Sequence, residues 1–201
     1  IGKSFRDSVD LPRIDKQELD YAKEFIHEHF KWIRPDGESF SIDAILDAAR
    51  GLILRHGINS IIIDPYNKIT HDFGNNNETT YINNLLTRLN VFKQKYDVHI
   101  FLVAHPRKMM KNHSGMYEVP TLYDVAGSSN FYNQVDNGIT VYRNFMEKIT
   151  TVHVQKVKFR HLGNIDAVDF KYNYLNGRFH ETGEEPDNDL YNVNRIENEQ
   201  L

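Results

Sequence analysis

Two polar residues that could take part in catalysis, Asp64 and His105, each close a short apolar run of the sequence. The runs read SIIID and IFLVAH. Because ligands of open α/β sheets gather at the carboxyl ends of strands, a carboxylate delivered there can hold a hydrated magnesium ion. Taken alone, Asp64 could cap a turn and His105 could be a satisfied turn residue. Side by side at one sheet edge, the two residues favour a magnesium ligand next to a phosphate sensor.

A basic segment follows His105 and contains Arg107, Lys108 and Lys111. It can be a solvated surface loop. It can also meet the phosphates of a nucleic acid, a contact driven by charge with little sequence preference. The segment HPRKMMKNH leaves both interpretations open.

A second cation pair, Lys158 and Arg160, stands in the segment VQKVKFRHLG. The β-rich neighbours predict that the pair alternates on a strand and projects to one face. Such cations can blunt an exposed sheet edge. They can also be aimed at the triphosphate of a neighbouring copy, as an arginine finger is. Spacing alone does not choose between these roles.

Other catalytic patterns find little support in the sequence. Gly2-Lys3-Ser4 looks like the end of a P-loop, but the upstream glycines are missing and Pro12 interrupts the long helix that should follow. His27 and His29 are two positions apart on a predicted helix, so they point to different faces and do not form a metal-hydrolase motif. The sequence contains neither a Gly-x-Ser-x-Gly elbow nor a dinucleotide glycine fingerprint.

The elements that must position these residues alternate between helix and strand. Apolar spacing predicts helices over 15–31, 41–57 and 78–96, the second with Ser41 as N-cap and Gly57 as its stop. The continuous runs INSIIID and VHIFLVAH predict strands buried on both faces. Three β-rich runs follow, in GITVYR, TTVHVQKVKF and AVDFKYN, and predict antiparallel strands at one edge. The rhythm is that of an α/β fold with a mostly parallel sheet.

Composition sets the remaining limits. The chain has 201 residues, which suits one α/β domain, and it has no cysteine for disulfides or zinc. No apolar run is long enough to span a membrane, so we expect a cytoplasmic protein. Residues 181–201 contain seven acidic residues and one basic residue and predict a disordered tail. Because the whole chain carries −4, the first 180 residues carry +2, and a polyanion partner is not excluded.

Four segments carry a resemblance to a known family. In order, INSIIIDPYN, VHIFLVAHPRK, LYDVAGSSNFYNQVDNGITVYR and VQKVKFRHLG resemble the RecA-like motor of hexameric replicative helicases. The resemblance is closest to the Twinkle and phage primase–helicase branch of the DnaB family. It covers residues 40–175, and the strand followed by HPRK is its most specific part.

The resemblance implies a role for each candidate residue. Asp64 matches the Walker B aspartate that positions water on the magnesium of MgATP, and His105 matches the γ-phosphate sensor. Lys158 and Arg160 match the Lys-x-Arg pair that reaches the ATP of the adjacent subunit.

Binding residues follow from the same resemblance. Residues 106–120 match the central-channel loop that grips single-stranded DNA, with Arg107, Lys108 and Lys111 as contacts. Arg143 and Tyr172 fall where the phage enzyme sandwiches the adenine of its nucleotide. The implied cofactors are ATP, or another NTP, and Mg²⁺. The implied partners are single-stranded DNA, further copies in a hexameric ring, and a fused or associated primase, in a bacterial or phage-encoded protein.

The family's P-loop and catalytic glutamate would lie before Ile1. In the family the P-loop strand lies between the sensor strand and the edge strands. Without it, the 201 residues of this chain are expected to leave a slot in the middle of the sheet and to expose apolar edges. We therefore expect residues 1–180 to form a partial RecA-like motor domain, with a mostly parallel sheet, flanking helices and an antiparallel edge, incomplete on its N-terminal P-loop side. This chain alone is expected neither to bind ATP tightly nor to hydrolyse it.

The leading hypothesis is the C-terminal part of an ATP-dependent DNA helicase motor that translocates on single-stranded DNA as a ring. An alternative is a non-catalytic RecA-like adaptor that binds DNA or loads a helicase. A third is a RecA-type recombinase, which would form open filaments rather than closed rings.

Overall fold

The structure, a computed structural model, describes residues 3, 4, 7, 12–34, 40–75, 77–111, 113, 115, 117–125 and 129–183. The chain divides into two compact units, and each is described by itself. Unit 1 comprises Ile1–Lys31, Val141–His153 and Asp166–Leu201. Unit 2 comprises Trp32–Thr140 and Val154–Ile165.

Two helices of unit 2 begin and end at the residues that the sequence predicts. Helix α2 (Ile42–His56) starts at Ser41, whose Oγ accepts the Ala44 N–H at 3.3 Å, and stops at Gly57 with φ +65°. That left-handed conformation is the reason a glycine ends the helix. Helix α3 (Glu78–Tyr96) starts at Asn77, whose side-chain oxygen accepts the Thr80 N–H at 2.8 Å. Both predicted helices are confirmed.

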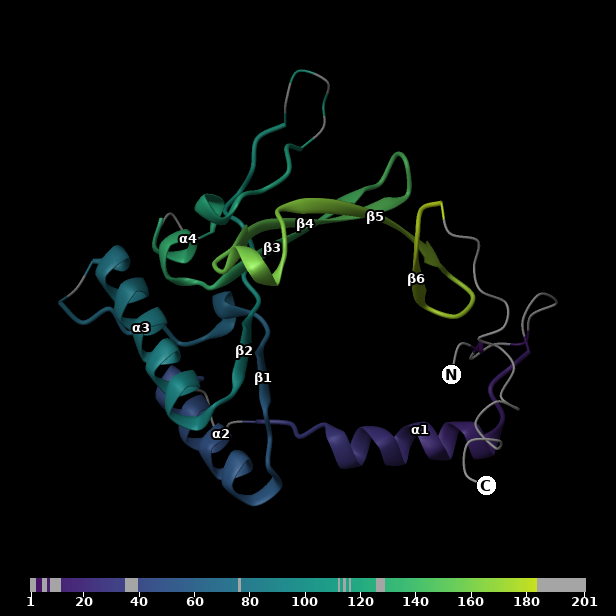
Figure 1. The fold of residues 1–201 in the computed structure, drawn as a ribbon, viewed down its shortest axis with the longest axis horizontal. Coiled ribbons are helices and arrows are strands. Elements are labelled where there is room, and N and C mark those ends of the chain that lie inside the picture. Colours follow the sequence, from purple (N-terminus) through teal and green to yellow (C-terminus); the bar gives the residue numbers. More distant parts are fainter. Residues whose placement is uncertain are drawn as a thin grey trace. The chain divides into compact units, whose positions relative to one another are not determined.

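Strands β1 (Ser60–Ile63) and β2 (His99–Leu102) form a parallel pair, and α3 is the crossover between them (Figure 1). The core of unit 2 lies where α2 and α3 pack on this pair, and Ile82 and Leu85 of α3 are its most deeply buried side chains. Because the carboxyl ends of both strands meet at one edge, this packing places the residues that follow them near each other.

The prediction that these strands are buried on both faces is wrong for unit 2. Ile61 and Ile63 are 6% exposed, whereas Ile62 between them is 63% exposed, and Phe101 on β2 is 49% exposed. Alternate residues of a strand point to opposite faces, and α2 and α3 cover only one of them. The pair therefore presents an apolar face that no described residue of unit 2 covers.

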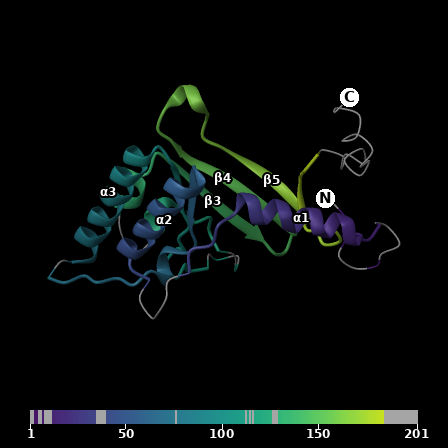
Figure 2. The same ribbon diagram turned by 90° about the horizontal axis from the view of Figure 1, so that it is seen from below.

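A second sheet of four strands has the order β3-β4-β5-β6 and is antiparallel (Figure 2). The three β-rich runs of the sequence form its first strands, which confirms the predicted antiparallel strands, although they form a sheet of their own among the described residues. The fourth strand was not predicted. The strands are β3 (Asn137–Asn144), β4 (Ile149–Val157), β5 (Asp166–Asn173) and β6 (Arg178–Glu181). Among the described residues the two sheets are separate.

Short elements complete the described residues. Helix α4 (Asn130–Gln134) packs against α3, and Phe131 of α4 is buried in the core of unit 2. The 3-10 turns are η1 (Tyr66–Lys68), η2 (Leu122–Asp124) and η3 (Arg160–Leu162).

Unit 1 contains the first predicted helix, α1 (Lys16–His29). Asp15 and Glu18 form a capping box at its start, with Asp15 accepting the Glu18 N–H at 2.9 Å. No residue of α1 is buried, and Phe25 and Ile26 are 46% and 47% exposed. Lys3 forms a hydrogen bond and an ion pair with Glu18.

No helix among the described residues is long and apolar enough to cross a membrane. Most of the predicted acidic tail, residues 184–201, lies outside the described residues.

Candidate functional site

Asp64 and His105 follow the carboxyl ends of two paired strands, as the sequence predicts. Ile63 of β1 pairs with Leu102 of β2, and Asp64 comes directly after Ile63. The Val103 N–H donates to the Ile63 carbonyl at 2.9 Å, so the pairing continues for one residue beyond β2. The structure therefore brings both residues to one edge of the parallel pair, which we call the strand-end site.

The turn η1 holds the strand-end site together. Its residue Asn67 accepts the backbone N–H of His105 at 2.8 Å, and the Tyr66 N–H donates to the Val103 carbonyl at 2.7 Å. Sequence reasoning missed Asn67, although an asparagine two residues after Pro65 is a turn-forming signal. These bonds fix the chain on both sides of the site.

The Asp64 and His105 side chains are exposed. Within the described residues, no hydrogen bond or ion pair engages the Asp64 carboxylate or the His105 ring. Nor do three His, Cys, Asp or Glu side chains gather anywhere in this part of the chain to enclose a metal. A single open carboxylate fits Mg²⁺, which keeps several waters and binds through one or two carboxylates plus substrate phosphates.

The basic segment lies in a long excursion between β2 and β3 that is closed at its base (Figure 1). Pro106 and Val125 form an antiparallel bridge, and the Arg107 N–H donates to the Asp124 carbonyl at 2.8 Å. The Arg107 guanidinium also lies 3.5 Å from the Asp124 carboxylate. Arg107 therefore belongs to the base of the loop, and its charge is already met by a carboxylate.

Asp124 is held ionised by its neighbours. Hydrogen bonds from the Thr121 backbone N–H at 2.8 Å and the Thr121 hydroxyl at 2.7 Å, together with the nearby Arg107, lower the pKa of Asp124. The Asp124 carboxylate therefore contacts both Arg107 and Thr121, on the two sides of the base.

Lys108 and Lys111 lie further out on the loop and are exposed. Lys111 forms an antiparallel bridge with Tyr117, and its Nζ lies 5.4 Å from the centroid of the Tyr117 ring. The two lysines are thus presented by a loop whose base and outer part are both braced.

The prediction that Lys158 and Arg160 alternate on a strand is wrong. Strand β4 ends at Val157, and Arg160 begins η3. The Lys158 N–H makes the last cross-strand bond, to the Asp136 carbonyl at 2.9 Å, and the chain then turns. The two side chains therefore do not share a strand face, although both are exposed near the end of β4.

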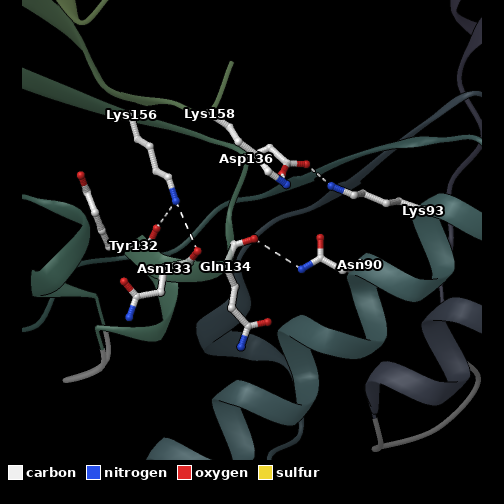
Figure 3. A network of polar contacts seen from close by, with 8 residues as sticks. All are labelled: Asn90, Lys93, Tyr132, Asn133, Gln134, Asp136, Lys156 and Lys158. Atoms are coloured by element: carbon white, nitrogen blue, oxygen red, sulfur yellow. Dashed lines mark hydrogen bonds and ion pairs between the residues drawn. The ribbon is translucent and has the colours of Figure 1, made fainter. Parts of the chain in front are cut away.

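Lys158 belongs to a cluster that sequence reasoning missed. The Asp136 carboxylate receives the Lys158 ammonium at 2.6 Å and also the ammonium of Lys93 from α3 (Figure 3). Burial alone would raise the pKa of Asp136, but hydrogen bonds from Lys158 and Lys93 lower it. This Asp136 cluster contains two positive charges and one negative charge, so it retains one net positive charge that an anion can balance.

Hydrogen bonds in the same region connect α4 to α3 and β4 (Figure 3). Lys156 of β4 donates to the carbonyls of Tyr132 and Asn133, the second at 3.3 Å. Asn90 of α3 donates to the Gln134 carbonyl at 3.4 Å. These contacts link α3, α4 and β4 within unit 2.

Arg143 and Tyr172 belong to unit 1, whereas the strand-end site and the Asp136 cluster belong to unit 2. Arg143 lies on β3 with its guanidinium 4.9 Å from the Phe145 ring centroid. Tyr172 lies on β5, 5.0 Å from the ring centroids of both Tyr174 and Phe179. Each residue is exposed and carries a flat surface that could stack on a base.

Comparisons with known proteins agree with this architecture. Residues 11–110 match the protein family described as AAA domain. The Twinkle homolog protein, chloroplastic/mitochondrial, of Arabidopsis thaliana is 34% identical over 176 residues. That alignment covers 84% of this chain and 24% of the Arabidopsis protein, so the chain spans about a quarter of that relative.

Two solved structures share the fold. One is described as an ATPase domain and superposes with a TM-score of 0.59 at 18% identity, covering 72% of this chain and 52% of that one. The other is a DnaB-like replicative helicase, whose structure was described with its interactions with primase, and it superposes with a TM-score of 0.66 at 17% identity. The second match covers 87% of this chain and 44% of that one.

Proposed function

The chain belongs to the RecA-like helicase domains of the DnaB and Twinkle type, and on that premise we propose that it is part of an ATP-driven motor that translocates on single-stranded DNA. The motor would act as a ring, expected to be hexameric, and could carry or bind a primase. The observation that carries the proposal is the pair of open polar side chains, Asp64 and His105, at the carboxyl ends of two paired parallel strands.

In this proposal the strand-end site faces the phosphates of a bound nucleotide. Bound MgATP would supply the transferable phosphoryl group and the ion that neutralises it. The Asp64 carboxylate would orient water on the ion, and the His105 ring, with its backbone fixed by Asn67, would contact the terminal phosphate. The exposure of both side chains supports this role, because neither needs to break a hydrogen bond or ion pair with a described residue.

Lys158 and Arg160 would act on the nucleotide of an adjoining copy. Two cations within three residues at the end of β4 can neutralise charge that develops on a transferring phosphoryl group. The net positive charge of the Asp136 cluster supports attraction of a phosphate to Lys158. Arg160 is exposed and meets no acidic side chain among the described residues, so it is the freer of the two.

Lys108 and Lys111 would contact the phosphates of single-stranded DNA. Arg143 and Tyr172 of unit 1 would each offer a flat surface on which a base can stack. The pairing of Arg107 with Asp124 supports a smaller share in DNA binding for Arg107 than for the two lysines.

The test uses the full-length protein that the gene encodes and separates a motor from an adaptor. We expect Arg160→Ala and Asp64→Asn each to reduce single-stranded-DNA-stimulated ATP hydrolysis on the order of a thousandfold. Arg55→Ala, at an exposed position of α2, serves as the control and should behave as wild type.

Mixing the two inactive variants tests action between copies. An Asp64→Asn subunit still offers Arg160 to a neighbour whose own Asp64 is intact, so mixed assemblies should regain part of the activity. Absence of ATP hydrolysis in the wild-type full-length protein, with DNA binding retained, would instead support the adaptor. Open filaments on DNA under the electron microscope would support the recombinase.

A further inference from the structure

The base of the loop that carries Lys108 and Lys111 is held by a side chain that the motor proposal does not use. Gln155 of β4 donates from Nε2 to the Pro120 carbonyl at 2.8 Å, and its Oε1 accepts the Leu122 N–H at 3.1 Å. A primary amide offers a donor and an acceptor in one plane, as a peptide group does. Gln155 therefore pairs with the loop backbone as a neighbouring strand would.

The Leu122 side chain adds an apolar contact to the same attachment. A Cβ placed on Gly138 of β3 would lie 2.2 Å from Leu122 Cδ1, far inside any normal contact distance. Gly138 is buried, so Leu122 occupies the space that any other residue would need. The loop base thus rests on β3 through Leu122 and on β4 through Gln155.

A third contact lies beside the first two. The Tyr123 ring stacks on the Tyr132 ring with centroids 4.7 Å apart and an angle of 19° between their planes. Lys156 of β4 lies over the Tyr132 ring, with its Nζ 5.0 Å from the ring centroid. Consecutive residues of the loop base, Leu122 and Tyr123, are therefore both connected to β4.

Strand β4, which receives these contacts, ends directly before Lys158 of the Asp136 cluster. Gln155 and Lys158 are three residues apart, and Lys158 makes the last cross-strand bond, to Asp136. Gln155 lies in β4, and Lys158 follows the last residue of β4 and is bonded to the Asp136 carbonyl, so strain at the loop base can be transmitted through these packed residues to Lys158. All of these residues lie in unit 2.

We propose that Gln155 is a positioning residue that fixes the loop base on β4 and couples occupancy of the loop by single-stranded nucleic acid to Lys158. This inference rests on the proposed function, because it takes Lys108 and Lys111 as nucleic-acid contacts and Lys158 as the cation that acts on a neighbour's nucleotide. Gln155 itself touches neither ligand.

The test measures ATP hydrolysis by the full-length protein with increasing oligodeoxythymidine. Gln155→Leu removes both hydrogen bonds at similar size, and Gln94→Leu makes the same substitution on α3 as the matched control. We expect Gln155→Leu to reduce the stimulation by oligodeoxythymidine about tenfold, which corresponds to two hydrogen bonds of ordinary strength. Gln94→Leu should match wild type.

The salt dependence of binding distinguishes positioning from direct contact. The slope of log affinity against log salt should stay unchanged in Gln155→Leu, because that residue meets no phosphate. It should become about one smaller in Lys108→Ala. A reduced slope in Gln155→Leu would overturn the positioning role.

A second variant covers the case in which Gln155→Leu unfolds. Gln155→Glu keeps the acceptor for the Leu122 N–H but places an oxygen against the Pro120 carbonyl, so its stimulation should fall below that of wild type. Wild-type stimulation in a well-folded Gln155→Leu or Gln155→Glu would refute the inference alone. A wild-type protein that oligodeoxythymidine does not stimulate would refute the proposed function and the inference with it.

Discussion

The strand-end site and the Asp136 cluster both carry charged or titratable groups in unit 2, but they treat those groups differently. At the strand-end site the backbone is hydrogen-bonded while the Asp64 and His105 side chains stay exposed. In the Asp136 cluster the carboxylate is part-buried and two ammonium groups already surround it. The strand-end site leaves its charged and titratable side chains available to a ligand. In the Asp136 cluster most of the charge is paired within the protein.

This difference predicts different consequences of mutation. A side chain without a protein partner contributes little to folding, so its loss should be seen in activity. A part-buried carboxylate between two cations contributes to folding, because its removal leaves the part-buried Lys93 ammonium and the exposed Lys158 ammonium without their partner.

The largest expected effect is a loss of activity without a loss of stability at Asp64. Asp64→Asn keeps the size of the side chain and removes its charge. In the full-length protein we expect ATP hydrolysis to fall on the order of a thousandfold, since a ligand that orients water on Mg²⁺ is lost. Thermal unfolding should stay at the wild-type temperature. A large fall in that temperature with hydrolysis retained would place Asp64 among the structural residues.

The opposite result is expected at Asp136. Asp136→Asn should lower the free energy of unfolding by about 2 kcal/mol, because the part-buried Lys93 and the exposed Lys158 both lose their counter-ion. Lys158→Met is the matched comparison and should cost less than about 1 kcal/mol, since Asp136 keeps Lys93. Urea unfolding of the three proteins measures both values. Equal costs for the two variants would mean that Lys93 does not compensate.

The same contrast explains which residues could be predicted from sequence. Asp64 and His105 each stand at the end of an apolar run, so a local pattern reveals them. The Asp136 cluster joins residues 43 and 22 positions apart, and nothing local connects Lys93 or Lys158 with that aspartate. Gln155 was missed for the same reason, because its partners Pro120 and Leu122 lie on a loop more than thirty positions away.

The fold shows a similar division. Helix α3 was predicted with both of its ends, since caps and apolar spacing are local signals. The burial of β1 was not predicted correctly, because a continuous apolar run does not show which face of the strand other elements cover. Ile62 of β1 is exposed. The end of β4 at Val157 and the turn η3 that begins at Arg160 were missed as well.

A smaller effect is expected where the loop base meets β3. Gly138→Ala would place a methyl group 2.2 Å from Leu122 Cδ1, so the Leu122 side chain must shift. We expect a loss of about 1–2 kcal/mol in the free energy of unfolding, in the range for overpacked sites. Adding Leu122→Ala should make the glycine substitution nearly free of cost, and a double-mutant cycle by urea unfolding measures this coupling. Additive costs would show that Leu122 and Gly138 do not share the space.

The smallest expected effect separates the two regions by pH. His71 lies close to the turn η1. Its ring centroid is 4.6 Å from that of Tyr66, and its Nδ1 is 3.2 Å from the Tyr81 hydroxyl. Burial lowers the pKa of His71, against opposing contributions from a hydrogen bond with the Tyr66 backbone and from the charge of Glu78. Burial also raises the pKa of Tyr66 to about 12, so the tyrosine stays neutral near pH 7.

The sign of the pH effect follows from proton uptake. Because the pKa of His71 is lower in the folded state, the unfolded chain binds more protons as the pH falls below the ordinary histidine value, and stability declines there. The pKa of Asp136 is also lowered, but its contribution is lost only as the pH falls below the ordinary aspartate value. Between about pH 7 and pH 5.5 the wild type should therefore lose more thermal stability than His71→Phe, which keeps a ring but cannot be protonated. Asp136→Asn should keep the wild-type slope of stability against pH over this interval. A flattened slope in Asp136→Asn would show that the titrating group belongs to the Asp136 cluster and is not His71.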